Sequence, residues 1–186
     1  MRTRRYKKSR PARRLFLVIC EGETEKNYVE ALKQEYRLPI SIKTKVSGQS
    51  INLRLVNQYI RELDLTTADE YRIFYIYDRD VKEIADRLSS LPGTAILTNP
   101  CIELWFLIHL KDCTKTLTSD EVVKALVCVH ENWKSYSKGN LSKFQIQDLT
   151  NNRNLATARA ALLKIPDNPS SNFPDFIEAL EKEKNS

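Results

Sequence analysis

The sequence predicts an α/β fold, with a parallel sheet flanked by helices on both faces and a helical C-terminal extension. Three observations lead to this prediction. Strand patterns alternate with amphipathic helix patterns over residues 15–100, and helix patterns dominate residues 101–186. The third is size, because 186 residues of which 41% are hydrophobic can form one domain with a buried core.

Four segments have the residue pattern of β-strands. Leu15–Cys20 is six apolar residues in a row, and Tyr71–Tyr77 is apolar on both faces apart from Arg72. Both patterns are typical of strands covered on two sides, and we expect the strand at 71–77 to be central. Residues 40–46 alternate between apolar and polar, which predicts a half-exposed strand near an edge. A short fourth strand is expected at 94–98.

Helices are predicted between these strands. Apolar residues recur at helical spacing over residues 24–36, 51–63 and 81–91, and Pro39 stops the first of these helices. The order of elements is therefore β-α-β-α-β-α-β. This order predicts parallel strands joined by right-handed crossovers.

The second half begins with signals for helix starts. Asn99 is expected to cap a buried helix over residues 101–110, with Pro100 at its first position. Thr118 to Glu121 has the pattern of a capping box at the start of the next helix.

The remaining residues predict a connection and two further helices. Residues 133–149 are polar and include a Gly-Asn pair, so we expect a connection there. Apolar residues form a helical stripe over 155–165, and a final helix is expected at 173–183. The helical extension, residues 101–186, is expected to pack on an α/β core of residues 15–100.

The positive charge is concentrated at the N-terminus. Residues 2–14 hold eight of the 30 Lys and Arg residues and no acid, which leaves 22 positive residues against 24 Asp and Glu. We therefore expect a flexible basic arm over residues 1–14, which suits nucleic acid because phosphate contacts release counterions. A solubilising terminus is the alternative. The basic residues of this arm are Arg2, Arg4, Arg5, Lys7, Lys8, Arg10, Arg13 and Arg14.

Composition argues against several classes of protein. No apolar run approaches the ~20 residues that span a bilayer, and no apolar segment of signal-peptide length precedes Cys20, so we expect no membrane association. The four cysteines show no C-x-x-C spacing, which argues against a zinc site or a disulfide framework. The expected location is a reducing cytoplasm.

Acidic residues follow two of the predicted strands where each strand ends. Glu21 and Glu25 come after the first strand, and Asp78 and Asp80 come after the third. Sites in open α/β sheets form at the carboxyl ends of strands, so these side chains are expected to converge if the two strands are neighbours. Crowded carboxylates repel one another, and a hard divalent cation removes that repulsion. The pattern therefore predicts a site for Mg²⁺ or Mn²⁺.

Each acidic motif also has a purely structural interpretation. The glutamates could complement a helix dipole, and Asp78 and Asp80 could act as turn or cap residues. Gly22 is expected to allow a sharp turn into the helix, whose free amides could receive a phosphate oxygen. Glu103, in the first turn of the buried helix, is expected at the same edge as a metal ligand or base, or as a helix-dipole acid.

Three other residues are interpreted structurally. His109 and Trp105 lie in an apolar helix and are expected to belong to the core. Lys138 could meet a phosphate, but a solvated loop lysine is the preferred interpretation.

Motifs in a fixed order connect the chain with a known family. They are Glu21-Gly22-Glu23-Thr24-Glu25, Asp78-Arg79-Asp80, the run NPCIELWFLIH over residues 99–109, and a late Tyr136-x-Lys138. Together they resemble the RloB-like proteins, which are related to the Abi phage-abortive proteins, over roughly residues 15–180.

This resemblance implies a Toprim-like (Rossmann-like) core, as in topoisomerases, primases and OLD-type nucleases. In Toprim proteins the first-strand Glu and the DxD pair hold Mg²⁺ for phosphodiester chemistry, and by position these residues are Glu21, Asp78 and Asp80. Glu25 matches a further acid of OLD-type nucleases. The resemblance also implies phage defence beside an ABC-type ATPase partner. The chain has no room for a topoisomerase tyrosine domain or a primase zinc domain, so those activities are not expected.

We therefore expect a Mg²⁺-dependent nuclease with Glu21, Asp78 and Asp80 as metal ligands. Glu25 or Glu103 would complete a second metal shell or act as general base. The alternative is a non-catalytic nucleic-acid-binding or adaptor subunit that works through an ATPase partner.

Overall fold

A five-stranded sheet forms the centre of the computed structural model, which describes residues 11–185. The strand order is β2-β1-β3-β4-β5; the first four strands are parallel, and the short β5 is antiparallel to β4. The strands are β1 Arg14–Cys20, β2 Ser41–Val46, β3 Glu70–Asp78, β4 Thr94–Asn99 and β5 Ser170–Ser171. The predicted α/β class is confirmed and is consistent with a Rossmann-like fold, with β2 at an edge and β3 in the middle.

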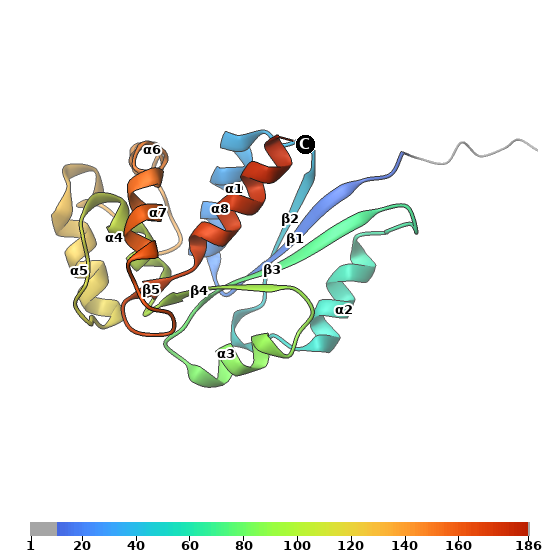
Figure 1. Cartoon of the computed structure of the whole chain (residues 1–186), viewed down its shortest axis with the longest axis horizontal. Coiled ribbons are helices and arrows are strands. Elements are labelled where there is room, and N and C mark those ends of the chain that lie inside the picture. Colours follow the sequence, from blue (N-terminus) through green and yellow to red (C-terminus); the bar gives the residue numbers. More distant parts are fainter. Residues whose placement is uncertain (1–10, 186) are drawn as a thin grey trace, which may run out of the picture.

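Helices cover both faces of this sheet (Figure 1). α1 and α8 lie on one face, with α4 to α7 continuing that layer beyond β4, and α2 and α3 lie on the other face. The helices are α1 Glu23–Tyr36, α2 Leu53–Glu62, α3 Lys82–Ser89, α4 Ile102–Leu110, α5 Ser119–Val129, α6 Lys143–Asn151, α7 Arg153–Ala161 and α8 Phe173–Lys184, with short 3₁₀ turns η1 Gly48–Ser50 and η2 Glu131–Trp133.

The apolar run of β1 is divided between two hydrophobic cores. Phe16 and Val18 face the core beneath α1, α4 and α8, whereas Leu17 and Ile19 face the core beneath α2 and α3. Successive side chains of a strand point to opposite faces, so a strand covered on both sides needs apolar residues at every position. This is the physical reason for the unbroken apolar run.

The helical extension is joined closely to the sheet. α4 is buried at every position from Ile102 to His109, as its uniformly apolar sequence predicts. At the end of the chain, β5 pairs with β4 and α8 packs beside α1 on the sheet (Figure 1). The last helix of the extension therefore completes the core of the α/β part.

The predicted cap of α4 is wrong. Asn99 is the last residue of β4, and its Nδ2 donates to the carbonyl oxygen of Pro166 at 2.9 Å. The N-cap position of α4 is Cys101, whose side chain makes no capping hydrogen bond. The amide of Ile102 in the first turn is instead satisfied by Asp78 Oδ1 at 2.8 Å. A side chain 24 residues earlier in the sequence thus takes the place of a local cap.

The predicted polar connection over residues 133–149 is also wrong, because it contains α6. Ser142 and Gln145 form a capping box that begins this helix, and the predicted box of Thr118 and Glu121 does begin α5. α6 buries only Gln145 and Leu149 among its side chains, so its sequence has little of the apolar periodicity that predicts a helix.

The apolar stripe predicted over residues 155–165 faces solvent. Leu155 is 52% exposed and Leu162 is 82% exposed, while the inward face of α7 carries Arg153 and small alanines. Arg153 donates to both carboxylate oxygens of Glu35, at 2.7 and 2.6 Å, and this pairing turns the charged residue inward.

The basic arm lies mostly outside the described residues, which begin at 11. Arg13 and Arg14 are described, and both are part of the fold. The Arg13 guanidinium donates to the carbonyl oxygens of Leu63 and Asp64, and Arg14 begins β1 and pairs with Glu183. The prediction of a flexible arm therefore fails for its last two basic residues.

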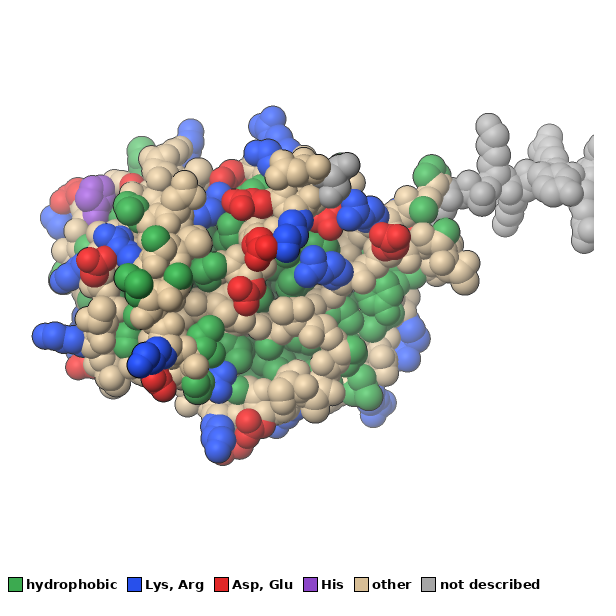
Figure 2. Space-filling model, viewed as in Figure 1, with side chains coloured by type: hydrophobic (Ala, Val, Ile, Leu, Met, Phe, Trp, Pro, Cys, Tyr) green, Lys and Arg blue, Asp and Glu red, His purple; other side chains and the backbone are tan. Residues whose placement is uncertain are grey.

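The surface charges are mixed in sign, and the cysteines form no disulfide. Figure 2 shows acidic and basic side chains interspersed over one face, with no broad area of a single sign. Within residues 11–185 no helix is both long and apolar enough to span a bilayer. All four cysteines are unpaired.

Candidate active site at the carboxyl ends of β1 and β3

The end of β1 and the end of β3 are joined by the side chain of Glu21. The strands are adjacent, with Cys20 opposite Ile76, and the Glu21 N–H continues their ladder to the Ile76 carbonyl oxygen at 3.0 Å. Glu21 Oε2 accepts the Asp78 N–H at 3.0 Å. The expected juxtaposition of these two acids is present, because the two strands are direct neighbours.

Asp78 connects this edge with α4. Its Oδ1 accepts the Ile102 N–H, so the residue does have a cap role, although toward α4 and not toward the helix that follows it in sequence. Burial raises the pKa of Asp78 to about 9, and repulsion from Glu25, Glu21 and Glu103 adds to the increase. The structural and functional interpretations therefore coexist in one side chain.

Glu25 is buried against the start of its own helix. Its Oε2 accepts the Gly22 N–H at 2.9 Å, so this amide is not free to receive a phosphate oxygen. Burial raises the pKa of Glu25 to about 7, with repulsion from Glu103 and Glu21 contributing. The carboxylate thus belongs to the same group as Glu21 and Asp78.

The role predicted for Gly22 is corrected by its geometry. Its φ of −137° is extended backbone that any residue adopts, so no left-handed turn occurs here. A Cβ at this position would instead lie 3.1 Å from Glu25 Oε2. Gly22 provides room for the Glu25 carboxylate to approach the backbone.

Glu103 reaches the same edge from α4. The residue is 1% exposed, and its Oε1 accepts the Tyr136 hydroxyl at 2.8 Å and lies 4.0 Å from Lys138 Nζ. Burial acts to lower the pKa of Lys138, but Glu103 and the other acids outweigh it and raise that pKa. Lys138 is therefore part of the site, and the Tyr136-x-Lys138 motif was the signal for it.

Asp80 lies at the margin of this group. It is exposed and lines a cleft with Arg79 and the start of α5, while its charge helps raise the pKa of Glu21, for which burial is the larger cause. Glu21, Glu25, Asp78 and Glu103, named here the acidic cluster, are the predicted residues that the structure brings together. Asp80 does not join them directly.

The acidic cluster has the donor chemistry of a site for a hard cation. All of its donors are carboxylate oxygens, and Glu103 Oε2 is buried without a hydrogen-bond partner. Among residues 11–185, however, no three His, Cys, Asp or Glu side chains are arranged as a ready metal site. Mg²⁺ is commonly held by only one or two carboxylates, with water and substrate phosphate completing its shell, and the cluster fits this pattern.

His109 is a core residue, as predicted. Its Nδ1 is hydrogen-bonded to the Trp105 carbonyl oxygen at 2.7 Å, and burial lowers its pKa to about 3. The imidazole is neutral at physiological pH, so Nδ1 is the donor in this bond.

Comparison with protein-family models connects the chain with a known family. A family model described as RloB-like protein matches residues 16–180. No curated protein and no solved structure matches the chain.

Proposed function

The chain belongs to the RloB-like family, and from this premise and the acidic cluster we propose that it is a Mg²⁺- or Mn²⁺-dependent nuclease with a Toprim-type acidic site. The substrate class is nucleic-acid phosphodiesters. Action in bacterial phage defence, beside an ABC-type ATPase partner, is part of the same proposal and follows from the family resemblance.

The observation that carries the proposal is the direct link between Glu21 and Asp78. The Oε2 of Glu21 accepts the Asp78 N–H at 3.0 Å. Both carboxyl groups have a raised pKa because each is partly buried among further acids. A protein that needed these residues only for folding would gain from a neutral pair of similar shape. Crowded acids at the carboxyl ends of parallel strands instead favour cation binding and catalysis.

Each residue of the site has a role in this proposal. Glu21 and Asp78 would hold the ion, with Asp80 at the margin as a third ligand. The bound ion would neutralise the cluster, polarise the scissile phosphate and acidify a water molecule. Glu25 or Glu103, the cluster's remaining carboxylates, would complete the shell of a second ion or accept the proton of the attacking water.

A specific observation favours a second candidate function. Within the described part of the chain, the acids do not form a ready three-ligand group. A nucleic-acid-binding or adaptor subunit with a vestigial site would also lack such a group. That candidate predicts binding to nucleic acid without cleavage.

The experiment compares Glu21→Gln and Asp78→Asn with a matched control, Glu23→Gln. Glu23 lies on the same turn but is exposed and pairs with Lys26. Single- and double-stranded DNA and RNA are incubated with each protein in Mg²⁺, Mn²⁺ or EDTA. We expect metal-dependent cleavage by the wild type and the control, and a loss of ~100-fold or more in the two cluster variants, because a metal supplies several kcal/mol of stabilisation. Cleavage unaffected by both cluster substitutions would contradict the proposal.

A further inference from the structure

The turn at residues 136–140 is docked against the beginning of α1. Gly139 has a φ of 78°, a left-handed conformation that favours glycine. Its N–H donates to Thr24 Oγ1 at 2.7 Å, and its carbonyl oxygen accepts from Asn27 Nδ2 at 2.7 Å. Both polar backbone groups of one residue are therefore bound by α1, which fixes the position of the turn.

This turn carries Lys138 to the acidic cluster. Lys138 Nζ lies 4.0 Å from Glu103 Oε1, the oxygen that also accepts the Tyr136 hydroxyl. This separation makes an ion pair and not a hydrogen bond. The lysine side chain is 60% exposed, and Nζ donates no hydrogen bond within residues 11–185. Its three N–H groups are therefore free to meet a ligand from solvent.

We propose, on the basis of the nuclease function above, that Lys138 binds a phosphodiester of a single nucleic-acid strand at the acidic cluster. The ionised carboxylates of the cluster repel a phosphate by Coulomb interaction, so a cation beside them favours binding of an anionic substrate. An ammonium is a compact charge with rotatable donors and is a common phosphate ligand. The docked turn holds the Lys138 ammonium beside the Glu103 carboxylate of the cluster, where it can meet the phosphate.

The competing interpretation is that Lys138 serves only as a counter-ion for Glu103. Glu103 is buried, but Lys138 is 60% exposed, so solvent screens this 4.0 Å pair and its contribution to folding is modest. The turn, moreover, is held through Gly139 and Tyr136, whose contacts do not involve the lysine side chain. Lys138 can therefore be substituted without removing the contacts that position the turn.

The test measures binding without metal and without cleavage. Lys138→Met is compared with Lys138→Arg and with Lys134→Met, a control on the same segment whose exposed lysine pairs with Glu131. The probes are a fluorescein-labelled twelve-nucleotide oligo(dT) and the matching oligo(U), followed by fluorescence anisotropy in EDTA at several salt concentrations. The two probes distinguish DNA from RNA as the preferred strand.

We expect Lys138→Met to weaken binding about tenfold, the effect of one charge-assisted hydrogen bond, and to reduce the salt slope by about 0.7. Lys138→Arg should keep most of the affinity, and Lys134→Met should bind as the wild type does. Melting temperatures equal to that of the wild type would show that the loss is not unfolding.

The outcomes separate this proposal from the nuclease function. Loss of binding in Lys138→Met, in a protein whose wild type cleaves nothing, supports the phosphate site while the nuclease proposal fails. Wild-type cleavage together with unchanged binding and salt slope in Lys138→Met overturns the phosphate site while the nuclease proposal holds. An equal loss in Lys134→Met, or no binding of either probe by the wild type, also overturns it.

Discussion

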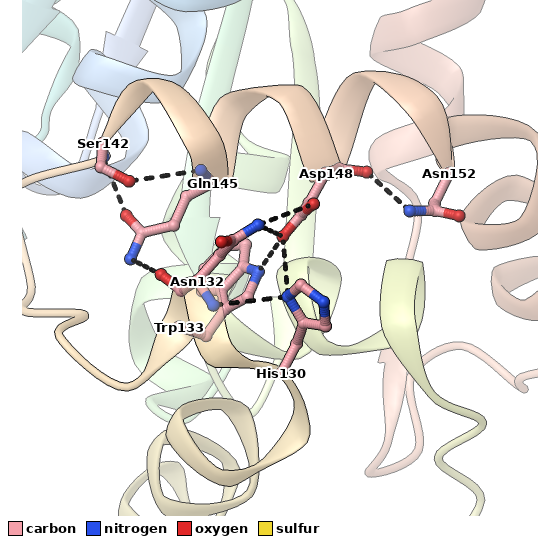
Figure 3. A network of polar contacts seen from close by, with 7 residues as sticks. All are labelled: His130, Asn132, Trp133, Ser142, Gln145, Asp148 and Asn152. Carbon is pink, nitrogen blue, oxygen red and sulfur yellow. Dashed lines mark hydrogen bonds and ion pairs between the residues drawn. The ribbon is translucent and has the colours of Figure 1, made fainter.

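One carboxylate, Asp148, and the four carboxylates of the acidic cluster have opposite surroundings. The carboxylate of Asp148, on α6, accepts hydrogen bonds from Asn132 Nδ2, at 3.2 Å to Oδ1 and 3.0 Å to Oδ2, and from Trp133 Nε1, at 3.0 Å to Oδ2 (Figure 3). Its Oδ2 also lies 3.5 Å from His130 Nδ1. Donors converge on this one acid and connect η2 with α6. In the acidic cluster, by contrast, four acids share a few backbone donors, the Tyr136 hydroxyl and the distant Lys138 ammonium.

The difference separates a carboxylate used for folding from carboxylates that we propose bind a ligand. The donors around Asp148 satisfy its carboxylate oxygens, so this acid needs no further ligand. Acids that raise one another's pKa lower the stability of the free protein, and a bound cation relieves that cost. The contrast can be tested by changes that should damage one group and not the other.

The largest effect on stability is expected at the Asp148 network. Asp148→Ala leaves the Nε1 of Trp133, a residue that is fully buried, and the Asn132 amide without their acceptor. We expect a loss of roughly 2–4 kcal/mol, because each unsatisfied buried group costs ~1–3 kcal/mol. At ~2–4 °C per kcal/mol, thermal unfolding should show a decrease of about 5–15 °C.

The control for this change is Asp112→Ala. Asp112 is exposed and pairs with Arg159 at the surface, so its loss should change stability little. Equal melting temperatures for Asp148→Ala and the wild type would show that the network does not stabilise the fold.

The same contrast explains how much of the fold the sequence could predict. Strands β1 and β3 were predicted well because strands buried on both faces have apolar residues at every position. α6 was missed because its position depends on Asp148, Asn132 and Trp133 meeting in three dimensions, a contact that leaves little periodicity in the helix itself. Asn99 failed as a cap because a distant carboxylate, Asp78, took that role.

The site was predictable to the extent that it depends on strand order. Glu21 and Asp78 were expected together because both follow strands that turned out to be neighbours. Lys138 was interpreted as a solvated lysine because its place depends on Thr24 and Asn27, which are 115 and 112 residues from Gly139. Such long-range docking leaves no local pattern in the sequence.

The next prediction concerns the pH dependence of the metal-free protein. Glu25 and Asp78 have folded-state pKa values of about 7 and about 9, both above their ordinary values of 4.5 and 3.8. Between these limits the folded state binds more protons than the unfolded state, so stability falls as pH rises from about 4 to about 9. Thermal unfolding in EDTA should show this decline, and Mg²⁺ should reduce it by stabilising the ionised acids.

Asp78→Asn isolates the contribution of Asp78 to that decline. The introduced amide oxygen could still accept the Ile102 N–H but carries no charge, so the variant should be more stable than the wild type near pH 8 in EDTA and should respond less to Mg²⁺. A pH dependence identical to that of the wild type would contradict the proposed repulsion within the cluster.

A smaller effect is expected where the cluster meets the docked turn. Thr24→Val removes the acceptor of the Gly139 N–H with little change in shape, at a cost of about 1 kcal/mol. Urea denaturation should show this loss, and oligonucleotide binding should weaken less than in Lys138→Met because Asn27 still holds the turn. Thr157→Val, at a half-buried position on α7, is the control.

The smallest effect on stability, and the most specific for the cluster, is expected from Gly22→Ala. The backbone of Gly22 is extended, so alanine adds no φ strain, and its Cβ meets only the end of the Glu25 side chain at 3.1 Å. The carboxylate must move by a few tenths of an ångström, which should cost less than about 1 kcal/mol. That movement weakens the bond to the Gly22 N–H, which favours the ionised carboxylate, so the pKa of Glu25 should rise further. If Glu25 accepts a proton in the reaction, the acidic limb of the pH–rate profile should shift to higher pH, while the melting temperature changes by less than ~2 °C.

Gly93→Ala is the contrasting control, because a Cβ there would lie 2.7 Å from the Ile73 carbonyl oxygen at a φ of +128°, and it should destabilise strongly. A pH–rate profile unchanged by Gly22→Ala would remove Glu25 from the reaction and leave it as a residue that only caps the start of α1.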